Sequence, residues 1–143
     1  MNVLNNWLVW SLLSALFAGA TAILAKVGVE GVNSNLATAI RTTVILVFAW
    51  LLASSALSGE AFANISRRTW IFLVLSGLAT GLSWVCYFRA LQLGQASQVA
   101  PVDKLSVIFA IAMAGLFLHE SLTWHHWVGG LLILCGVIVI AVK

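Results

Sequence analysis

The sequence predicts an all-α membrane protein with five transmembrane helices. The first observation is composition: 62% of the 143 residues are hydrophobic and 8% are charged, against about 45–50% and about 25% in average proteins. The second is a series of apolar runs close to the roughly 20 residues that a helix needs to cross a bilayer. The third is that these runs show no apolar–polar alternation, which excludes a membrane β-barrel.

Five apolar runs separated by short polar linkers define the predicted spans. Trp7, Trp70 and Trp124 stand at the ends of such runs, where aromatic belts lie at membrane surfaces. A chain of this length holds one ordinary domain, so we expect a single transmembrane domain over residues 1–143. The spans are expected at about residues 7–25, 36–57, 70–88, 99–118 and 124–142.

The fourth span draws charged residues into the membrane. Its uninterrupted apolar part, Leu105–Leu118, has 14 residues and would extend about 21 Å as a helix, less than the hydrocarbon thickness of about 30 Å. The helix must therefore begin earlier and include Asp103 and Lys104. Arg41 interrupts the second span in the same way. Pro101 is expected in the first turn of the fourth helix, where its missing N–H does no harm.

Charged side chains at membrane depth are the candidate site residues. They cost about 2.5–3.5 kcal/mol each at a helix centre and usually face a protein interior or a wet cavity. The candidates are Arg41, Arg89, Asp103 and Lys104. Arg and Lys have an alternative, since their long side chains can snorkel to the interface. A short carboxylate cannot, so we expect Asp103 to pair with Arg41 or Arg89.

One face of the third predicted helix carries aromatic and hydroxyl groups. Trp84 and Tyr87 follow Ser76 and Thr80 at helical spacing, and the face ends at Arg89. Such a face suits an amphipathic ligand. Internal packing between helices is the alternative explanation.

Several function classes have no support in the sequence. There is no nucleophile–base set, phosphate loop or pair of catalytic carboxylates, so we expect no enzyme activity and no cofactor. A net charge of +3, scattered along the chain, indicates no nucleic-acid partner. The cluster His119, Glu120, His125 and His126 is not expected to bind a metal, because the two adjacent histidines diverge on a helix. The expected partners are the lipid bilayer, a small-molecule substrate and a second protein chain.

The stretch Leu73–Glu120 and the residues after it carry a family resemblance. The helix end "YFRAL" leads through a short Gly–Ser linker to a Pro, an acidic residue follows the next apolar run, and "WVGGLLILCGVIVI" closes the chain. Nearly all of the chain resembles the EamA domain of the drug/metabolite transporter superfamily. The resemblance implies one five-helix EamA-type repeat, and secondary transport by alternating access in a bacterial or archaeal inner (cell) membrane.

This sequence departs from ten-helix members of that superfamily by supplying one repeat. A five-helix unit ends on the face opposite to its start, so the inverted mate must come from another chain. Without the embedded cations Arg41, Arg89 and Lys104, two Lys or Arg residues remain on each membrane face, which favours dual topology and an antiparallel homodimer. Counting all seven gives five against two, which favours one orientation and a parallel or heteromeric partner.

The lead hypothesis, a transporter with its site at a dimer interface, assigns roles to the candidates. The expected function is a homodimeric transporter of a small charged or zwitterionic metabolite or drug, with proton coupling as one option. In such a transporter, Asp103 would be the coupling group. Arg41, Arg89 and Lys104 would hold a negative group, and Trp84 and Tyr87 would contact the apolar part. The first predicted helix lacks the carboxylate on which small multidrug resistance transporters rely, which disfavours cationic drugs. A non-transporting membrane subunit that assembles with a larger partner is the alternative function.

Overall fold

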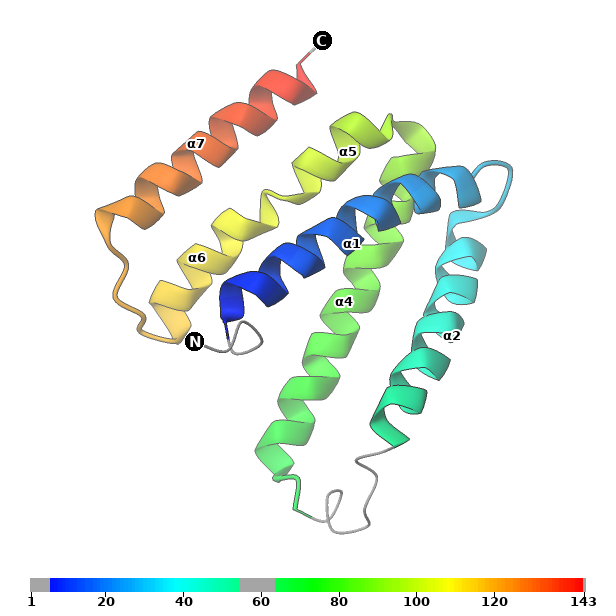
Figure 1. The fold of residues 1–143 in the computed structure, drawn as a ribbon, viewed down its shortest axis with the longest axis horizontal. Coiled ribbons are helices and arrows are strands. Elements are labelled where there is room, and N and C mark those ends of the chain that lie inside the picture. Colours follow the sequence, from blue (N-terminus) through cyan, green and yellow to red (C-terminus); the bar gives the residue numbers. More distant parts are fainter. Residues whose placement is uncertain (1–5, 55–63, 143) are drawn as a thin grey trace. The chain divides into compact units, whose positions relative to one another are not determined.

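The computed structural model describes residues 6–54 and 64–142, and these contain helices and no strand. The all-α prediction is therefore confirmed. Residues 55–57 at the end of the predicted second span lie outside the described residues. In chain order (Figure 1), the helices are α1 (Trp7–Gly28), α2 (Ser34–Ala53), α4 (Arg67–Leu93), α5 (Ala96–Asp103), α6 (Ser106–Phe117) and α7 (Trp124–Ala141).

Five helical segments of the described chain are long and apolar enough to cross a membrane, as the sequence predicts. α1, α2, α4 and α7 each form one, and α5 together with α6 forms the fourth, Ala96–Phe117. Their side chains are suited to hydrocarbon: Trp7 is 76% exposed and Leu82 is 70% exposed. Lipid covers such apolar surface in a membrane protein, so burial within the chain is limited to a few positions.

Local capping explains where the helices begin. The side chain of Asn6 accepts a hydrogen bond from the Leu8 N–H at 3.0 Å, and Asn33 accepts one from the Asn35 N–H at 2.9 Å. These side chains satisfy N–H groups that the first helical turn leaves without a partner. At the start of α7, the Thr123 N–H donates to Nδ1 of His126 at 3.1 Å in a capping box.

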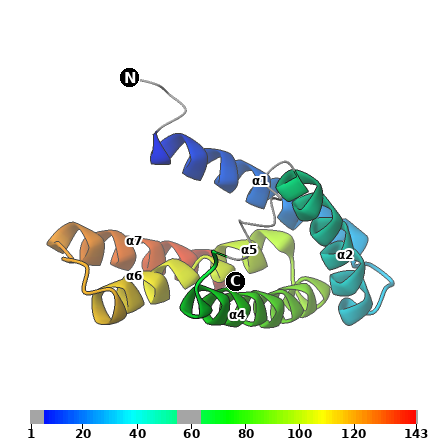
Figure 2. The same cartoon turned by 90° about the horizontal axis from the view of Figure 1, so that it is seen from below.

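The chain divides into two compact units, which are described separately. One unit comprises residues 1–25 and 93–143, and the other comprises residues 26–92. In the first unit, α6 continues in nearly the direction of α5, and α7 returns alongside both, as Figures 1 and 2 show. The second unit holds the end of α1, all of α2 and nearly all of α4. The single domain expected over residues 1–143 stays a prediction.

The fourth span is interrupted within the membrane segment. α5 ends at Asp103 and α6 begins at Ser106. At Lys104 and Leu105 the N–H groups donate to carbonyls three residues back, each at 3.0 Å. This is a 3₁₀ pattern, which in the middle of a helix often marks a functional hinge. The charged residues predicted to enter the fourth span therefore lie at its break.

The expected place of Pro101 in the first turn of the fourth helix is wrong. α5 begins at Ala96, which makes Pro101 its sixth residue. At that position proline removes an N–H from the helical hydrogen-bond ladder and its ring crowds the preceding turn. Pro101 therefore weakens the helix just before the break.

The end of α6 holds a residue in a strained backbone conformation. His119 has φ of 53°, the left-handed region, and is the non-glycine residue of the described chain with positive φ. This reversal lets the Glu120 N–H donate back to the Ala114 carbonyl at 3.2 Å. Left-handed geometry costs a residue with a Cβ roughly 1–2 kcal/mol, so the turn is maintained against local strain.

We expect His119→Gly to raise the free energy of unfolding by about 0.5–1 kcal/mol, because glycine tolerates this φ but gains entropy in the unfolded chain. Thermal unfolding in detergent measures the change. His125→Gly is the matched control: it places glycine in helix α7, where glycine lowers stability. Equal effects of the two substitutions would contradict the assignment of strain to His119.

Candidate functional site

Arg41 lies against aromatic rings inside the second span. It is the eighth residue of α2, which begins at Ser34. Its Cζ lies 4.4 Å from the centroid of the Trp84 ring and 5.5 Å from that of Phe88, both on α4. Both distances are within the roughly 6 Å typical of cation–π contacts, which are worth about 2 kcal/mol or more when desolvated. The structure thus brings two predicted site residues, Arg41 and Trp84, together.

The aromatic wall beside Arg41 is anchored by a buried ring. Phe88 is 3% exposed. Tyr87 packs against it edge-on, with ring centroids 6.5 Å apart and an angle of 70° between the planes. Trp84 and Tyr87 are themselves half-buried. The rings that face the guanidinium are therefore held in place.

Arg89 binds a neighbour on its own helix. Its Nη1 donates to Oε1 of Gln92 at 3.2 Å, and Nε2 of Gln92 donates to the Val32 carbonyl at 2.5 Å. The guanidinium of Arg89 is thereby linked through one amide to the loop between α1 and α2. It is exposed, so it remains within reach of a ligand.

Asp103 and Lys104 form an ion pair at the break in the fourth span. Nζ of Lys104 lies 3.5 Å from Oδ2 of Asp103, and the two side chains are 56% and 36% exposed respectively. The expected pairing of Asp103 with Arg41 or Arg89 stays a prediction, because those arginines belong to the other unit. An ion pair between neighbours in sequence is geometrically loose, so the carboxylate can exchange Lys104 for another cation.

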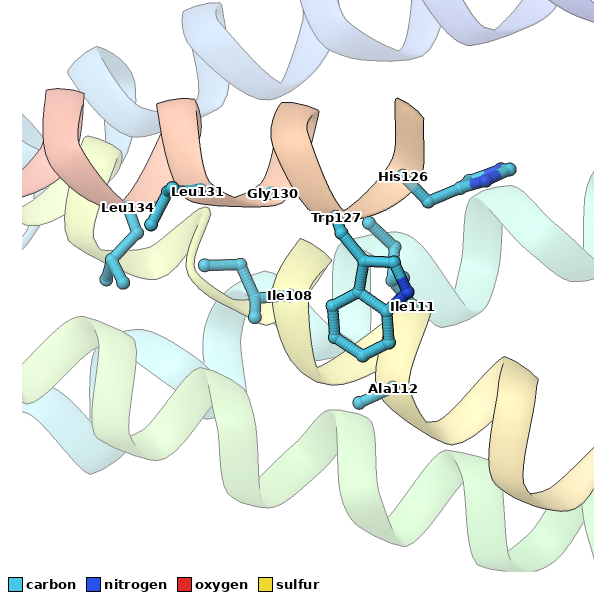
Figure 3. Close-up of a pocket in the computed structure, with 8 residues that line it drawn as sticks. All are labelled: Ile108, Ile111, Ala112, His126, Trp127, Gly130, Leu131 and Leu134. Carbon is cyan, nitrogen blue, oxygen red and sulfur yellow. The ribbon is translucent and has the colours of Figure 1, made fainter. Parts of the chain in front are cut away.

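The first unit also contains an apolar groove between α6 and α7. Figure 3 shows the indole of Trp127 directed toward α6, while the ring of His126 points away from the groove. Its uncharged walls suit hydrocarbon. The groove encloses about 350 Å³ and is lined by Ile108, Ile111, Ala112, His126, Trp127, Gly130, Leu131 and Leu134.

One member of the histidine cluster, His126, caps the start of α7. Nδ1 of His126 accepts from the Thr123 N–H and lies 2.9 Å from the Thr123 hydroxyl. Across residues 6–54 and 64–142, the structure contains no group of three His, Cys, Asp or Glu residues arranged to hold a metal ion.

Sequence reasoning missed one residue of the Arg41 site, Phe88, and the hydrogen-bond partner of Arg89, Gln92. Phe88 is four residues after Trp84, and Gln92 is four residues after Phe88. Residues at this spacing lie on one helix face, so a systematic search from Trp84 would have found both. Snorkelling was also the expectation for Lys26 and stays a prediction; the structure adds that its Nζ donates to the Leu91 carbonyl at 2.7 Å.

The comparisons with known proteins identify relatives over nearly the full chain. The model of the EamA-like transporter family matches residues 5–142. A protein of Sinorhizobium sp, named an uncharacterized transporter in the cobO 3′ region, is 48% identical over 138 residues, 96% of this chain and 98% of the relative. No solved structure matches the chain significantly.

Two further relatives are more distant. A protein of Enterobacter sp. (strain 638), named probable 4-amino-4-deoxy-L-arabinose-phosphoundecaprenol flippase subunit ArnE, is 31% identical over 100 residues, 68% of this chain and 94% of the relative. The uncharacterized protein MJ1333.1 of Methanocaldococcus jannaschii is 28% identical over 72 residues, 50% of this chain and 53% of the relative.

Proposed function

We propose a mode of transport from one premise: the chain belongs to the EamA-like transporter family and is an integral membrane transporter. Because that family consists of transporters, the chain is not an enzyme. The proposed substrate is a small charged or zwitterionic metabolite or drug, moved by secondary transport. The proposed location is the inner (cell) membrane of a bacterium or archaeon, the sources of the named relatives.

The observation that carries the proposal is the guanidinium of Arg41 on the rings of Trp84 and Phe88. Among the described residues of its own unit, 26–54 and 64–92, Arg41 forms no ion pair. A cation at membrane depth is costly without a counter-charge. An anionic group of the substrate would supply that charge, and its apolar part would contact the aromatic wall of Trp84 and Tyr87.

Asp103 is the proposed coupling group, and Lys104 and Arg89 are proposed to assist in holding the anionic group. Alternating spans begin the second and fourth helices on the same membrane face. Arg41 and Asp103 are each the eighth residue of their spans, so each lies roughly 10 Å from that helix start. Discontinuous helices supply ion-binding groups in many secondary transporters, which supports the break beside Asp103 as the coupling position.

The proposed assembly is an antiparallel homodimer. One five-helix repeat lacks the inverted mate that alternating access by rocking halves requires. The Sinorhizobium relative is matched over 98% of its own length by 96% of this chain, so it too corresponds to a single repeat. The balanced Lys and Arg count outside the embedded cations supports insertion in both orientations.

Assembly with a different subunit is the second candidate. The observation that favours it is the name of the Enterobacter relative, a probable flippase subunit. Under this function the chain would complete its passage with another membrane protein rather than with its own copy. The five-against-two count of all Lys and Arg residues would then reflect a single orientation.

Reconstitution of the purified chain into liposomes tests the proposal. A panel of labelled sugar phosphates, dicarboxylates and amino acids is offered with and without a proton gradient. We expect the chain alone, purified as a dimer, to accumulate at least one of these compounds. Purification as a heteromer, with flux only when the second subunit is present, would select the second candidate. Absence of flux from both preparations would contradict both.

A further inference from the structure

A polar cavity lies in the unit of residues 26–92, apart from the residues proposed for transport. It has a volume of about 410 Å³, which is within the range of roughly 300–1,000 Å³ found for small-molecule sites. It is formed where α1 ends, at the loop to α2, and at the end of α4. Its lining residues are Lys26, Val29, Glu30, Gly31 and Gln92.

The walls of this rim cavity are fixed by buried and hydrogen-bonded groups. Val29 is 1% exposed, and Leu91, beside Gln92 in sequence, is fully buried at 0%. The Leu91 carbonyl accepts from Nζ of Lys26 at 2.7 Å, and Gln92 donates to the Val32 carbonyl at 2.5 Å. Two side-chain bonds therefore hold the end of α4 to the last turn of α1 and the loop after it.

The turn that brings Glu30 to the cavity depends on a glycine. Gly31 has φ of 73°, a conformation that glycine adopts without the Cβ strain of other residues. The helix α1 ends at Gly28, so the chain reverses within a few residues. This tight reversal places the carboxylate of Glu30 and the ammonium of Lys26 on one cavity.

Opposite charges on one cavity select the ligand by its charge pattern. A purely anionic ligand is attracted by Lys26 and repelled by Glu30. A purely cationic ligand is attracted by Glu30 and repelled by Lys26. A ligand with both charges is attracted by both residues. Because the cavity lies at the end of a spanning helix, it is at the level of the membrane surface, where both lipid headgroups and water-soluble molecules reach it.

We propose that the rim cavity binds a zwitterion that carries an ammonium group and a phosphate or carboxylate group. The ammonium faces Glu30, the anionic group faces Lys26, and the amide of Gln92 supplies a neutral polar contact. The ligand is either the headgroup of an ethanolamine phospholipid or a soluble molecule of the same chemistry. None of the proposed transport residues lines this cavity; Arg89 reaches it only as the donor to Oε1 of Gln92.

Native mass spectrometry of the purified full-length chain tests the proposal. The protein is offered phosphatidylethanolamine and phosphatidylglycerol with identical acyl chains. We expect the wild type to retain the ethanolamine lipid roughly threefold to fivefold better, the scale of a partly exposed ion pair. Glu30→Gln should remove the preference, and Glu30→Lys should invert it. Glu120→Gln, which removes a carboxylate from the linker after α6, should leave it unchanged.

Competition with O-phosphoethanolamine distinguishes the two sources. Displacement of the lipid at millimolar concentration would support a soluble ligand, and retention of the lipid would support a headgroup. Equal retention of both lipids by the wild type, together with no binding of O-phosphoethanolamine, would overturn the proposal. An unchanged preference in both Glu30 variants would also overturn it. Glu30 is exposed, so these variants should fold, and their thermal unfolding in detergent verifies this.

Discussion

Arg41→Ala is expected to lower the rate of substrate uptake in liposomes by about tenfold to a hundredfold. The substitution removes a charge-assisted contact, and such contacts are worth roughly 1.5–3 kcal/mol, which corresponds to that range. It also leaves Trp84 and Phe88 without the cation that covers them. The measurement is initial uptake of the compound that the liposome panel identifies, at matched protein content.

Two variants make the Arg41 result specific. Arg41→Lys keeps the charge but loses the planar stacking surface of the guanidinium, so its uptake should be intermediate. Arg68 provides a matched control, because its Cζ lies 5.8 Å from the centroid of the Phe72 ring, near the start of α4. Arg68→Ala removes a similar cation–π contact and should leave uptake nearly unchanged. Equal losses in Arg41→Ala and Arg68→Ala would show that the contact serves packing and not substrate.

The contrast between Arg41 and Arg68 bears on why an arginine is placed inside the second span. Arg68 lies in the first turn of α4, where snorkelling reaches water at little cost. Arg41 is seven residues into α2 from its first residue, Ser34. Aromatic rings offset part of its desolvation cost but supply no negative charge. A ligand that brings this charge would bind more tightly than its contact area alone suggests.

The spans and their charged residues follow from the sequence because hydrocarbon imposes a simple rule. A bilayer requires about 20 apolar residues per helix, and the chain shows five such runs. The same length argument predicted that Asp103 and Lys104 enter the fourth span, and they lie within Ala96–Phe117. These predictions depend on length and polarity, which a single sequence displays directly.

The contacts between the site residues could not be predicted from the sequence. Arg41 and Trp84 were both candidates, but nothing in the sequence says which aromatic residue a given cation will face. The bond from Lys26 to the Leu91 carbonyl could not be predicted, because every residue carries a backbone acceptor. The position of Pro101 was predicted wrongly for a different reason. Proline is favoured in the first helical turn, so the sequence predicted that position, whereas Pro101 lies inside α5.

The break at Lys104 and Leu105 connects the fold to the proposed coupling. At the break the N–H groups of Lys104 and Leu105 keep 3₁₀ hydrogen bonds, which is one way in which a membrane helix satisfies its backbone next to a proline. Asp103 is the last residue of α5 and its side chain is 36% exposed, so the carboxylate of the proposed coupling group is accessible beside the break. Movement at the break would carry the carboxylate with it, so protonation and rearrangement of the fourth span would be linked.

Asp103→Asn should abolish accumulation driven by a proton gradient while leaving exchange down the substrate's own gradient. Asparagine preserves the shape of the side chain but cannot take up and release a proton. The gradient-driven component should fall at least about tenfold, the effect of roughly 1.4 kcal/mol. Uptake is measured in one liposome preparation with the gradient imposed and then collapsed by an ionophore, so that each sample supplies its own reference.

Two controls decide between coupling and stability as the origin of that loss. Glu120→Gln neutralises a carboxylate that lies outside the helices, between α6 and α7, and should retain gradient-driven accumulation. Lys104→Gln removes the partner of the 3.5 Å ion pair but keeps the carboxylate that exchanges protons. It should therefore leave accumulation dependent on the proton gradient. If Lys104→Gln and Asp103→Asn lose accumulation equally, the ion pair itself is required for the structure of the break, and Asp103 is not the coupling group.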